Sequence, residues 1–545
     1  MAASQIEGSP SPPGSEWDQS HKRPVRPLAI AVLAGGFVFL YFSLFYLPDI
    51  PIHLLTDQVT LLFDARQMLD GRMIYRDFFQ FTLPGTQVVY FGLFKMFGVR
   101  TWIPNAMLIV LGLSIMVLMV VIGRKVVPAR AALLAAALFL VVPFRSQLDG
   151  THHWYSTLWV MGALALIMEA RTSARLAGAG ALLGLSTCFT QTRGLPAAAA
   201  VALFLVWETR RKGWTFRRFW RLQFHFWWAF IAVLVGFNAY FAWQTGLGKF
   251  LSDTVLFGLR YFPAVGWNTW RVYMIDVPYL HPWYRLPALG VFLSIHLLIP
   301  LIYILFFARY WTAAKQNPDA PWDRLMLLSL TGLFIFIGIA SAPSWLRICA
   351  VSPPGLILFV WFWNLPGRTR GLRVKAIWAL VVLLALGECA ERQVRWHQTI
   401  NLPTGRTAVL QPRLLESLQY FRQITRPGDY FFGDELFKYL LDLRDPARVA
   451  HVTPTDFTRP SQVESVIEGL STHHVKYALW ATNLDLPPAR YAGHNNLGPL
   501  RDYLRRHYHL VRMFGGGGMV LERNAGPGNA AKPPAGPANK RSREK

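Results

Sequence analysis

The stretch PLAIAVLAGGFVFLYFSLFYL (residues 27–47) runs for 21 residues without a charged side chain. A bilayer core needs roughly 20 apolar residues per helix, so this stretch predicts a membrane-spanning helix near the N-terminus. Residues 48–55, which follow it, offer no small-residue cleavage site. We therefore interpret the stretch as a permanent anchor and not as a removable signal peptide.

The composition of the whole chain points to the same class of protein. Of its 545 residues, 53% are hydrophobic and only 16% are charged, which is typical of membrane proteins. The net charge of +25 would suit a nucleic-acid partner, but Lys and Arg form short clusters between apolar runs and not one soluble basic face. Membrane lipids are therefore expected as partners, and nucleic acid is not. The three cysteines form no CxxC pair and no histidine lies at metal-ligand spacing, so neither a disulfide nor a zinc site is predicted.

Ten further apolar runs follow the first, which predicts an α-helical polytopic membrane protein with about eleven transmembrane helices. The run at 194–208 is short enough to tilt or re-enter, so a count of about ten to thirteen stays open. The eleven runs are residues 27–47, 102–123, 129–147, 153–170, 176–192, 194–208, 222–244, 286–308, 325–341, 346–365 and 375–391.

Positive charge orients these runs. Lys and Arg cluster after every second run, as in HKRPVR (21–26), GRKVVPAR (123–130) and GRTRGLRVK (367–375). Because such clusters stay in the cytoplasm, the N-terminus is predicted to be cytoplasmic. The outer side then receives two long loops, 48–101 and 245–285, and the chain that follows the transmembrane domain of residues 27–391.

The chain changes character after the last run. Residues 405–525 contain no run long enough to span a membrane, and strand-like runs alternate with amphipathic stretches, which predicts a small α/β domain on the outer side. Gly515–Gly518 is interpreted as a hairpin turn and not as a phosphate loop, because no helix and no GK[ST] follow it. Residues 1–26 and 526–545 are predicted to be disordered tails, the second one basic. The predicted strands are 429–433, 448–452, 476–482, 509–514 and 519–523.

The first outer loop carries the strongest candidate for chemistry. Asp57 stands within about ten residues of the end of the first span, close to the membrane surface. TLLFDARQML (60–69) predicts a helix lying along the interface, and LPG before TQVVYFGLFKMF (86–97) predicts a second one. A carboxylate at this height can act as a general base on a hydroxyl acceptor. The alternative is that Asp57 caps the helix beginning at Gln58.

The same loop resembles that of a known family. An acidic residue after the first span, a G-x-x-x-Y-R-D-F segment and a P-G that opens a helix ending in F-G are similar to the first periplasmic loop of the GT-C membrane glycosyltransferases. The similarity is greatest to bacterial relatives of protein O-mannosyltransferases and lipid A aminoarabinose transferases. Members often carry an Asp-Glu pair here, whereas Gln58 follows Asp57, so the second acidic role is unfilled or moved. The segment consists of Gly71, Tyr75, Arg76, Asp77 and Phe78.

The resemblance implies an inverting glycosyltransferase that moves a sugar from a polyprenyl-phosphate carrier to a hydroxyl acceptor. Asp57 would be the catalytic base, and no metal cofactor would be needed. The reaction would take place at the outer face of the bacterial inner membrane, with a periplasmic C-terminal domain. The acceptor would be a glycolipid, a polysaccharide or a protein.

A lipid-phosphate leaving group needs cations near the outer surface. Arg145, Arg193 and Arg347 each lie at the outer end of a predicted span, and Arg76 lies in the first loop. We predict that these arginines bind the lipid phosphate. The alternative for each is snorkelling to lipid headgroups.

Sugar and acceptor contacts are predicted at two short outer turns and in the first loop. In QLDGTHHWYS (147–156), Asp149, His152 and His153 can bind sugar hydroxyls and Trp154 can stack on a sugar face. Gln191 belongs to the polar content of another turn. Asp77 has either a direct role or pairs with a neighbouring arginine to fix the loop.

Two alternatives to a glycosyltransferase stay open. One is a lipid or solute transporter or flippase, which tends to carry ionisable residues or broken helices near the midplane. The span centres here are nearly free of charge, which favours catalysis at the outer surface. The other alternative is a surface-polysaccharide polymerase or ligase, which the sequence does not exclude.

Overall fold

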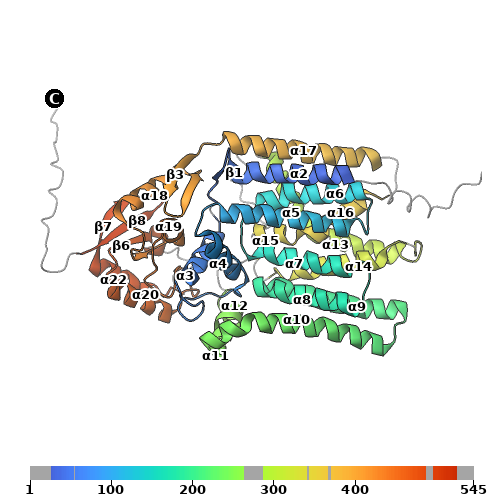
Figure 1. Cartoon of the computed structure of the whole chain (residues 1–545), viewed down its shortest axis with the longest axis horizontal. Helices are drawn as coiled ribbons and strands as arrows, with labels where there is room; N and C mark the ends of the chain where they lie inside the picture. Colours follow the sequence, from blue (N-terminus) through green and yellow to red (C-terminus); the bar gives the residue numbers. More distant parts are fainter. Residues whose placement is uncertain are drawn as a thin grey trace, which may run out of the picture.

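The computed structural model describes residues 26–54, 56–262, 286–318, 320–340, 343–365, 370–485 and 495–524. Long helices lie side by side in a bundle, and a smaller part with strands and short helices sits at one end of it (Figure 1). Residues 1–25, which make up all but the last residue of the first predicted tail, the whole second predicted tail (526–545) and most of the predicted loop 245–285 lie outside the described residues.

A helix lies at each of the eleven apolar runs. The run at 194–208 is part of a helix of 22 residues, which is long enough to cross a bilayer. The helices of the bundle are α2 (Arg26–Leu44), α5 (Ile103–Gly123), α6 (Ala129–Phe139) with its continuation η1 (Leu140–Phe144), α7 (His152–Ile167), α8 (Ser173–Phe189), α9 (Gln191–Lys212), α10 (Phe216–Thr245), α13 (Leu286–Ala313), α14 (Trp322–Ile337), α15 (Trp345–Ala350) with α16 (Ser352–Trp363), and α17 (Arg370–Val394).

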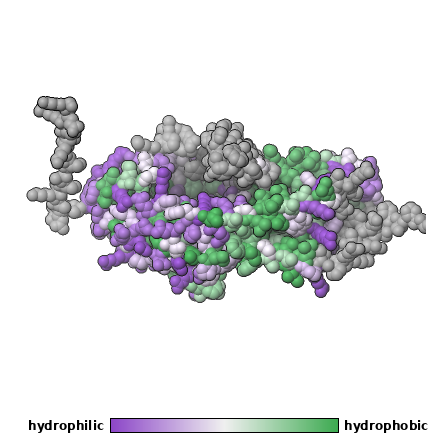
Figure 2. Space-filling model, turned by 90° about the horizontal axis from the view of Figure 1, so that it is seen from above, coloured by the Kyte–Doolittle hydropathy of each residue, from purple (hydrophilic) through white to green (hydrophobic). Residues whose placement is uncertain are grey.

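The chain is a multi-pass membrane protein. Among the described residues, α2, α5, α10 and the His296–Ala313 part of α13 are each long and apolar enough to cross a membrane, and two shorter apolar helices accompany them. Hydrophobic residues form a band over the bundle, with hydrophilic residues on both sides of it (Figure 2). That all eleven helices span the membrane stays a prediction.

Two glycines allow α8 and α10 to pack at close range. A Cβ atom at Gly180 would lie 2.1 Å from the carbonyl oxygen of Phe226, and one at Gly184 would lie 2.5 Å from that of Phe230. Small residues four positions apart let helix backbones approach each other within a membrane. The α8–α10 pair therefore depends on these two positions.

Gly184→Leu is expected to lower the free energy of unfolding by about 1–3 kcal/mol or more, because the new side chain must push the two backbones apart. Gly236→Leu is the matched control, since a Cβ atom at Gly236 of α10 meets nothing within 4 Å. Thermal unfolding of the purified protein in detergent measures both variants. Equal melting temperatures for the two would contradict the close contact.

The first outer loop forms α3 (Gln58–Leu69) and α4 (Gly85–Phe97), as the sequence predicts. That α3 lies along the membrane interface stays a prediction. Val59, Leu62, Phe63 and Asp64 are all buried, because α4 packs against one side of the helix and α19 (Glu435–Leu440) against another. The helix is therefore enclosed by protein and held in place by the C-terminal part.

The C-terminal part is built of strands and helices. Its sheet has the order β5-β6-β8-β7, with β5 and β6 parallel and the other neighbours antiparallel. Gly515–Gly518 connects β7 to β8 as the predicted hairpin turn. The elements are β3 (Gln398–Leu402), β4 (Gly405–Val409), α18 (Pro412–Ile424), β5 (Phe431–Phe432), α20 (Pro460–Thr472), β6 (Tyr477–Ala481), α21 (Thr482–Asp485), α22 (Gly498–His507), β7 (Tyr508–Met513) and β8 (Gly518–Arg523).

The strand predicted at 448–452 is wrong, because these residues form a loop. Their backbone groups bond to other partners and not to a neighbouring strand. The Arg448 carbonyl accepts a hydrogen bond from the Phe79 N–H at 2.7 Å, and the Ala450 carbonyl accepts one from Lys438 Nζ at 2.9 Å. The loop thus joins the C-terminal part to the first outer loop.

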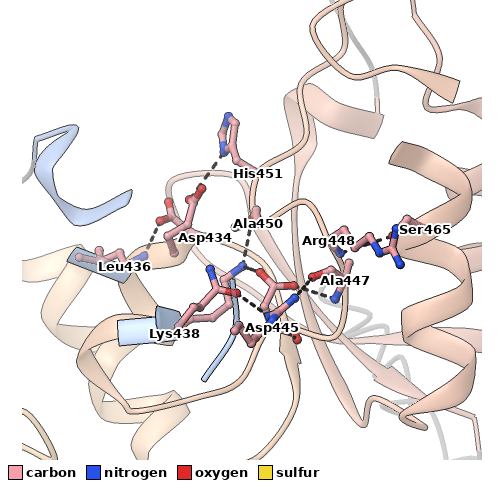
Figure 3. Close-up of polar contacts among 12 residues, drawn as sticks. Asp434, Leu436, Lys438, Asp445, Ala447, Arg448, Ala450, His451 and Ser465 are labelled. Carbon is pink, nitrogen blue, oxygen red and sulfur yellow. Dashed lines mark hydrogen bonds and ion pairs between the residues drawn. The ribbon is translucent and has the colours of Figure 1, made fainter. Parts of the chain in front are cut away.

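The C-terminal part holds the first outer loop on both sides of Asp57. Before it, the His53 N–H donates to the carbonyl of Ala408 in β4 at 2.8 Å. After it, Arg66 of α3 forms an ion pair with Asp442 at 2.6 Å. The C-terminal part also contains a fully buried ion pair of Lys438 and Asp445 (Figure 3), with 2.5 Å between Nζ and Oδ2.

Candidate active site

Asp57 occupies the position immediately before α3 and its side chain is exposed. The carboxylate makes no capping hydrogen bond to the helix. The capping alternative therefore has no contact to support it, and the carboxylate is available to a ligand.

A second carboxylate lies beside Asp57. The Gln58 N–H donates to Asp149 Oδ1 at 3.1 Å, so Asp149 reaches the start of α3 from the loop between η1 and α7. Asp149 is only 3% exposed. Burial, together with the negative charge of Asp57, raises the pKa of Asp149 to about 8, which favours the protonated form of this carboxyl group. A distant part of the chain thus places a second acidic side chain beside Asp57.

Hydrogen bonds fix the loop that carries Asp149. The Gly150 N–H donates to Gln58 Oε1 at 2.8 Å, and the Tyr90 hydroxyl of α4 donates to the Gly150 carbonyl at 2.8 Å. A Cβ atom at Gly150 would lie 2.5 Å from the Tyr90 hydroxyl oxygen, so the position needs glycine. Both helices of the first outer loop therefore set the position of Asp149 relative to Asp57.

Two arginines lie near this pair of carboxylates. Arg193, in the first turn of α9, is 1% exposed and donates through Nη1 to Thr157 Oγ1 at 2.8 Å and to the His153 carbonyl at 3.1 Å. Its Nε and Nη2 have no partner among the described residues. Arg347 of α15 interacts electrostatically with both Arg193 and Asp57. Arg193 is buried and retains unused donors, and its neighbour Arg347 is half-buried. Two adjacent cations of this kind favour an anionic ligand.

His152 and His153 lie at the same place. Their rings are 4.1 Å apart, and both Nδ1 atoms are buried without a partner among the described residues. The backbone carbonyl of His153 orients Arg193, and that of His152 accepts a hydrogen bond from Thr190 at 3.2 Å. The predicted motif at 147–156 therefore contributes to the site through its backbone as well as its side chains.

The other two predicted phosphate ligands lie elsewhere. Arg145 forms an ion pair with Glu388 of α17 at 2.8 Å. Arg76 forms one with Asp77 at 2.8 Å and is exposed. The structure brings Arg193 and Arg347 together with Asp57 but does not place Arg145 or Arg76 with them.

The remaining predicted residues have structural contacts. Trp154 is 0% exposed and packs between Phe139 and Phe144, so it has no free face for the predicted sugar stacking. Asp77 accepts a hydrogen bond from the Met73 N–H at 2.8 Å. The Arg76 side chain that bonds to it lowers the pKa of Asp77, which fits the alternative that Asp77 fixes the loop.

Gln191, at the start of α9, connects the bundle to the second outer loop. Its Nε2 donates to the Thr254 carbonyl in η2 (Ser252–Leu256) at 3.2 Å. The sequence assigns Gln191 to sugar or acceptor binding, and the structure places it between the arginine site and the wall of this loop.

A buried acid in α3 was not predicted as a functional or structural feature. Asp64 accepts hydrogen bonds from Gln80 Nε2 at 2.7 Å and from Gln87 Nε2 at 3.4 Å. Burial outweighs these donors and raises the pKa of Asp64 to about 7. The sequence of an amphipathic helix does not reveal that other parts of the protein will cover its polar side as well as its apolar side. The burial of Asp64 could therefore not be predicted.

The stability of the fold should therefore depend on pH through Asp64. Between about pH 4 and 7 the folded protein retains a proton that the unfolded chain releases, so the free energy of unfolding falls as the pH rises through this window, by at most about 1.4 kcal/mol per pH unit for one proton. Asp64→Asn removes this contribution. Melting temperatures measured from pH 4 to 7 should fall less steeply for the variant than for the wild type, and parallel curves would refute the assignment.

No protein-family model and no curated protein matches this sequence. Solved structures do match. ArnT from Cupriavidus metallidurans bound to undecaprenyl phosphate aligns with a TM-score of 0.58 and 14% identity over 91% of this chain and 98% of that chain. The apo state of ArnT aligns with a TM-score of 0.57 and 15% identity over 91% and 97% of the two chains. The archaeal oligosaccharyltransferase AglB from Archaeoglobus fulgidus, in complex with an inhibitory peptide and a dolichol-phosphate, aligns with a TM-score of 0.50 and 11% identity over 91% and 74%.

Proposed function

We propose that this chain, which has the fold of the GT-C membrane glycosyltransferases, transfers a sugar from a polyprenyl-phosphate carrier to a hydroxyl acceptor. The observation that carries the proposal is the exposed carboxylate of Asp57 beside the buried Arg193 and the half-buried Arg347. A base and an anion site within one cluster are the two groups that such a transfer requires.

In this reaction Asp57 takes the proton of the acceptor hydroxyl as its oxygen attacks the anomeric carbon. The bond between that carbon and the phosphate oxygen breaks on the opposite face, so the configuration inverts. The lipid phosphate leaves with the electron pair, and Arg193 and Arg347 stabilise its charge. That ArnT was solved with undecaprenyl phosphate and AglB with a dolichol-phosphate supports a polyprenyl-phosphate carrier.

Asp149 has a supporting role in this scheme. Its protonated carboxyl leaves Asp57 without a second negative charge beside it, since two adjacent carboxylates resist ionising together. It also accepts the Gln58 N–H at 3.1 Å and so fixes the backbone next to the base. The site would lie on the outer side of a bacterial inner membrane, with the C-terminal part in the periplasm.

We expect the transfer to proceed without a metal. The proposed stabilisation of the leaving phosphate comes from the arginines, so this step calls for no metal ion. Transfer by the purified protein should therefore be unchanged in EDTA. Loss of activity in EDTA that Mg²⁺ restores would contradict this.

The function is tested by deleting the gene in its native host and analysing surface glycolipids, polysaccharides and glycoproteins by mass spectrometry. One sugar should be missing, and the wild-type gene should restore it. Uptake or efflux defects without any missing sugar would favour a transporter instead.

A further inference from the structure

A cavity of about 690 Å³ lies where three separate parts of the chain meet. Its wall includes Tyr75, Arg76, Phe78 and Phe79 of the first outer loop, part of the α11–η2 segment (residues 247–256) and one side of α20. This volume is within the range of small-molecule binding pockets. None of the proposed donor-site residues lines it.

Acidic, hydroxyl and cationic side chains all line the cavity. Glu464, Ser465 and Glu468 come from successive turns of α20, and Arg448 lies beside them, as the contact between Arg448 and Ser465 shows (Figure 3). Lys249 of α11 forms an ion pair with Asp253 at 2.5 Å. Arg76 and Arg459 also line the cavity, so four cationic and three acidic side chains surround one space together with hydroxyls. The positive charge of the lining is therefore nearly balanced.

Arg459, the residue just before α20, connects the three walls of the cavity. The guanidinium carbon of Arg459 lies 4.9 Å from the Phe79 ring centre and 5.3 Å from that of Phe257. Its Nη2 lies 3.7 Å from Asp253 Oδ1. Arg459 Nε has no hydrogen-bond partner among the described residues. The cavity is therefore held open by charged and aromatic contacts that bridge all three parts.

The cavity is also connected to the donor site. Gln191 donates to the carbonyl of Thr254, the residue next to Asp253 in the cavity wall. Gln191 lies two positions before Arg193 in α9. A ligand in the cavity would therefore be on the same end of the bundle as the leaving phosphate (Figure 1).

We propose that this cavity binds the acceptor and that the acceptor is a saccharide. The inference rests on the proposed function. Paired carboxylate and cationic groups around one space suit a polyhydroxylated ligand, because each sugar hydroxyl both donates and accepts a hydrogen bond. None of the residues that line the cavity belongs to a strand, so the cavity offers no sheet edge to which an extended peptide could add.

Ser465→Trp, which fills the cavity, tests the proposal against Ser471→Trp, an exposed position in the last turn of the same helix. Each variant is expressed in the deletion strain, and the restored sugar is measured by mass spectrometry. Binding of undecaprenyl phosphate to the purified variants is measured by thermal shift. Ser465→Trp should restore at least tenfold less sugar and bind the lipid normally, while Ser471→Trp should match the wild type in both.

A double variant, Glu464→Gln with Glu468→Gln, guards against misfolding of the bulky variant. It should lower transfer about tenfold with an unchanged melting temperature. Normal transfer by Ser465→Trp, or loss of lipid binding together with transfer, would overturn the assignment. If the sugar that the deletion strain lacks is one normally attached to protein side chains, the assignment is also overturned, because the acceptor would then be a peptide. If Asp57→Asn restores the sugar fully, the proposed function itself fails, whatever the cavity variants do.

Discussion

Asp57→Asn is expected to reduce sugar transfer on the order of 10²–10⁴-fold, the contribution typical of a general base. The amide keeps the size of the side chain but cannot accept the hydroxyl proton. Because Asp57 makes no capping hydrogen bond, the variant should fold and insert into the membrane normally. Its melting temperature and its binding of undecaprenyl phosphate should equal those of the wild type.

Asp70→Asn is the matched control for this variant. Asp70 follows the other end of α3 and forms an exposed ion pair with Arg66. Surface pairs of this kind contribute about 0–1 kcal/mol, so transfer should be nearly unchanged. Transfer by Asp57→Asn at the wild-type rate, measured with purified protein and a saturating donor, would show that Asp57 is not the base.

Arg193→Gln is expected to weaken binding of the lipid phosphate at least about 30-fold, since losing one partner of a buried charge pair costs about 2–5 kcal/mol. The melting temperature without lipid should stay the same or rise, because the substitution removes a buried cation with unused donors. If Arg193 only supported the fold, its replacement would lower the melting temperature without lipid and leave lipid binding unchanged. Thermal shift over a series of undecaprenyl phosphate concentrations measures both quantities.

Arg145→Gln serves as the comparison for Arg193→Gln. Both arginines lie at the outer end of a predicted span, but Arg145 is paired with Glu388 and is not placed with Asp57. Its replacement should leave lipid binding within about threefold of the wild type. Equal weakening by the two variants would mean that the phosphate is not bound where the structure brings Arg193 and Arg347 together.

The helices of the bundle could be predicted from the sequence because each one is a long apolar run, and the α/β character of the C-terminal part because its strands and helices have distinct periods. The prediction of a strand at 448–452 was wrong because of local hydrogen bonds. RVAHV alternates like a strand, but its carbonyls bond to Lys438 and to the first outer loop, and such partners are not visible in the sequence.

The candidate site could be predicted only in part. Asp57 stands out because it follows the first span, but the closeness of Asp149 depends on a fold that brings together Gln58 and Gly150, 92 residues apart in the chain. Trp154 shows the opposite difficulty. A tryptophan next to two histidines at a span end suits a sugar site and a packed core equally well, and only the contacts with Phe139 and Phe144 decide for the core.

The central claim is that one cluster at the outer end of the bundle holds both the base and the leaving phosphate. An experimental structure of the protein with undecaprenyl phosphate tests it most directly. The phosphate oxygens are expected within hydrogen-bond distance of Arg193 and Arg347, next to Asp57. A phosphate bound at Arg145, or at the opposite end of the bundle, would contradict it.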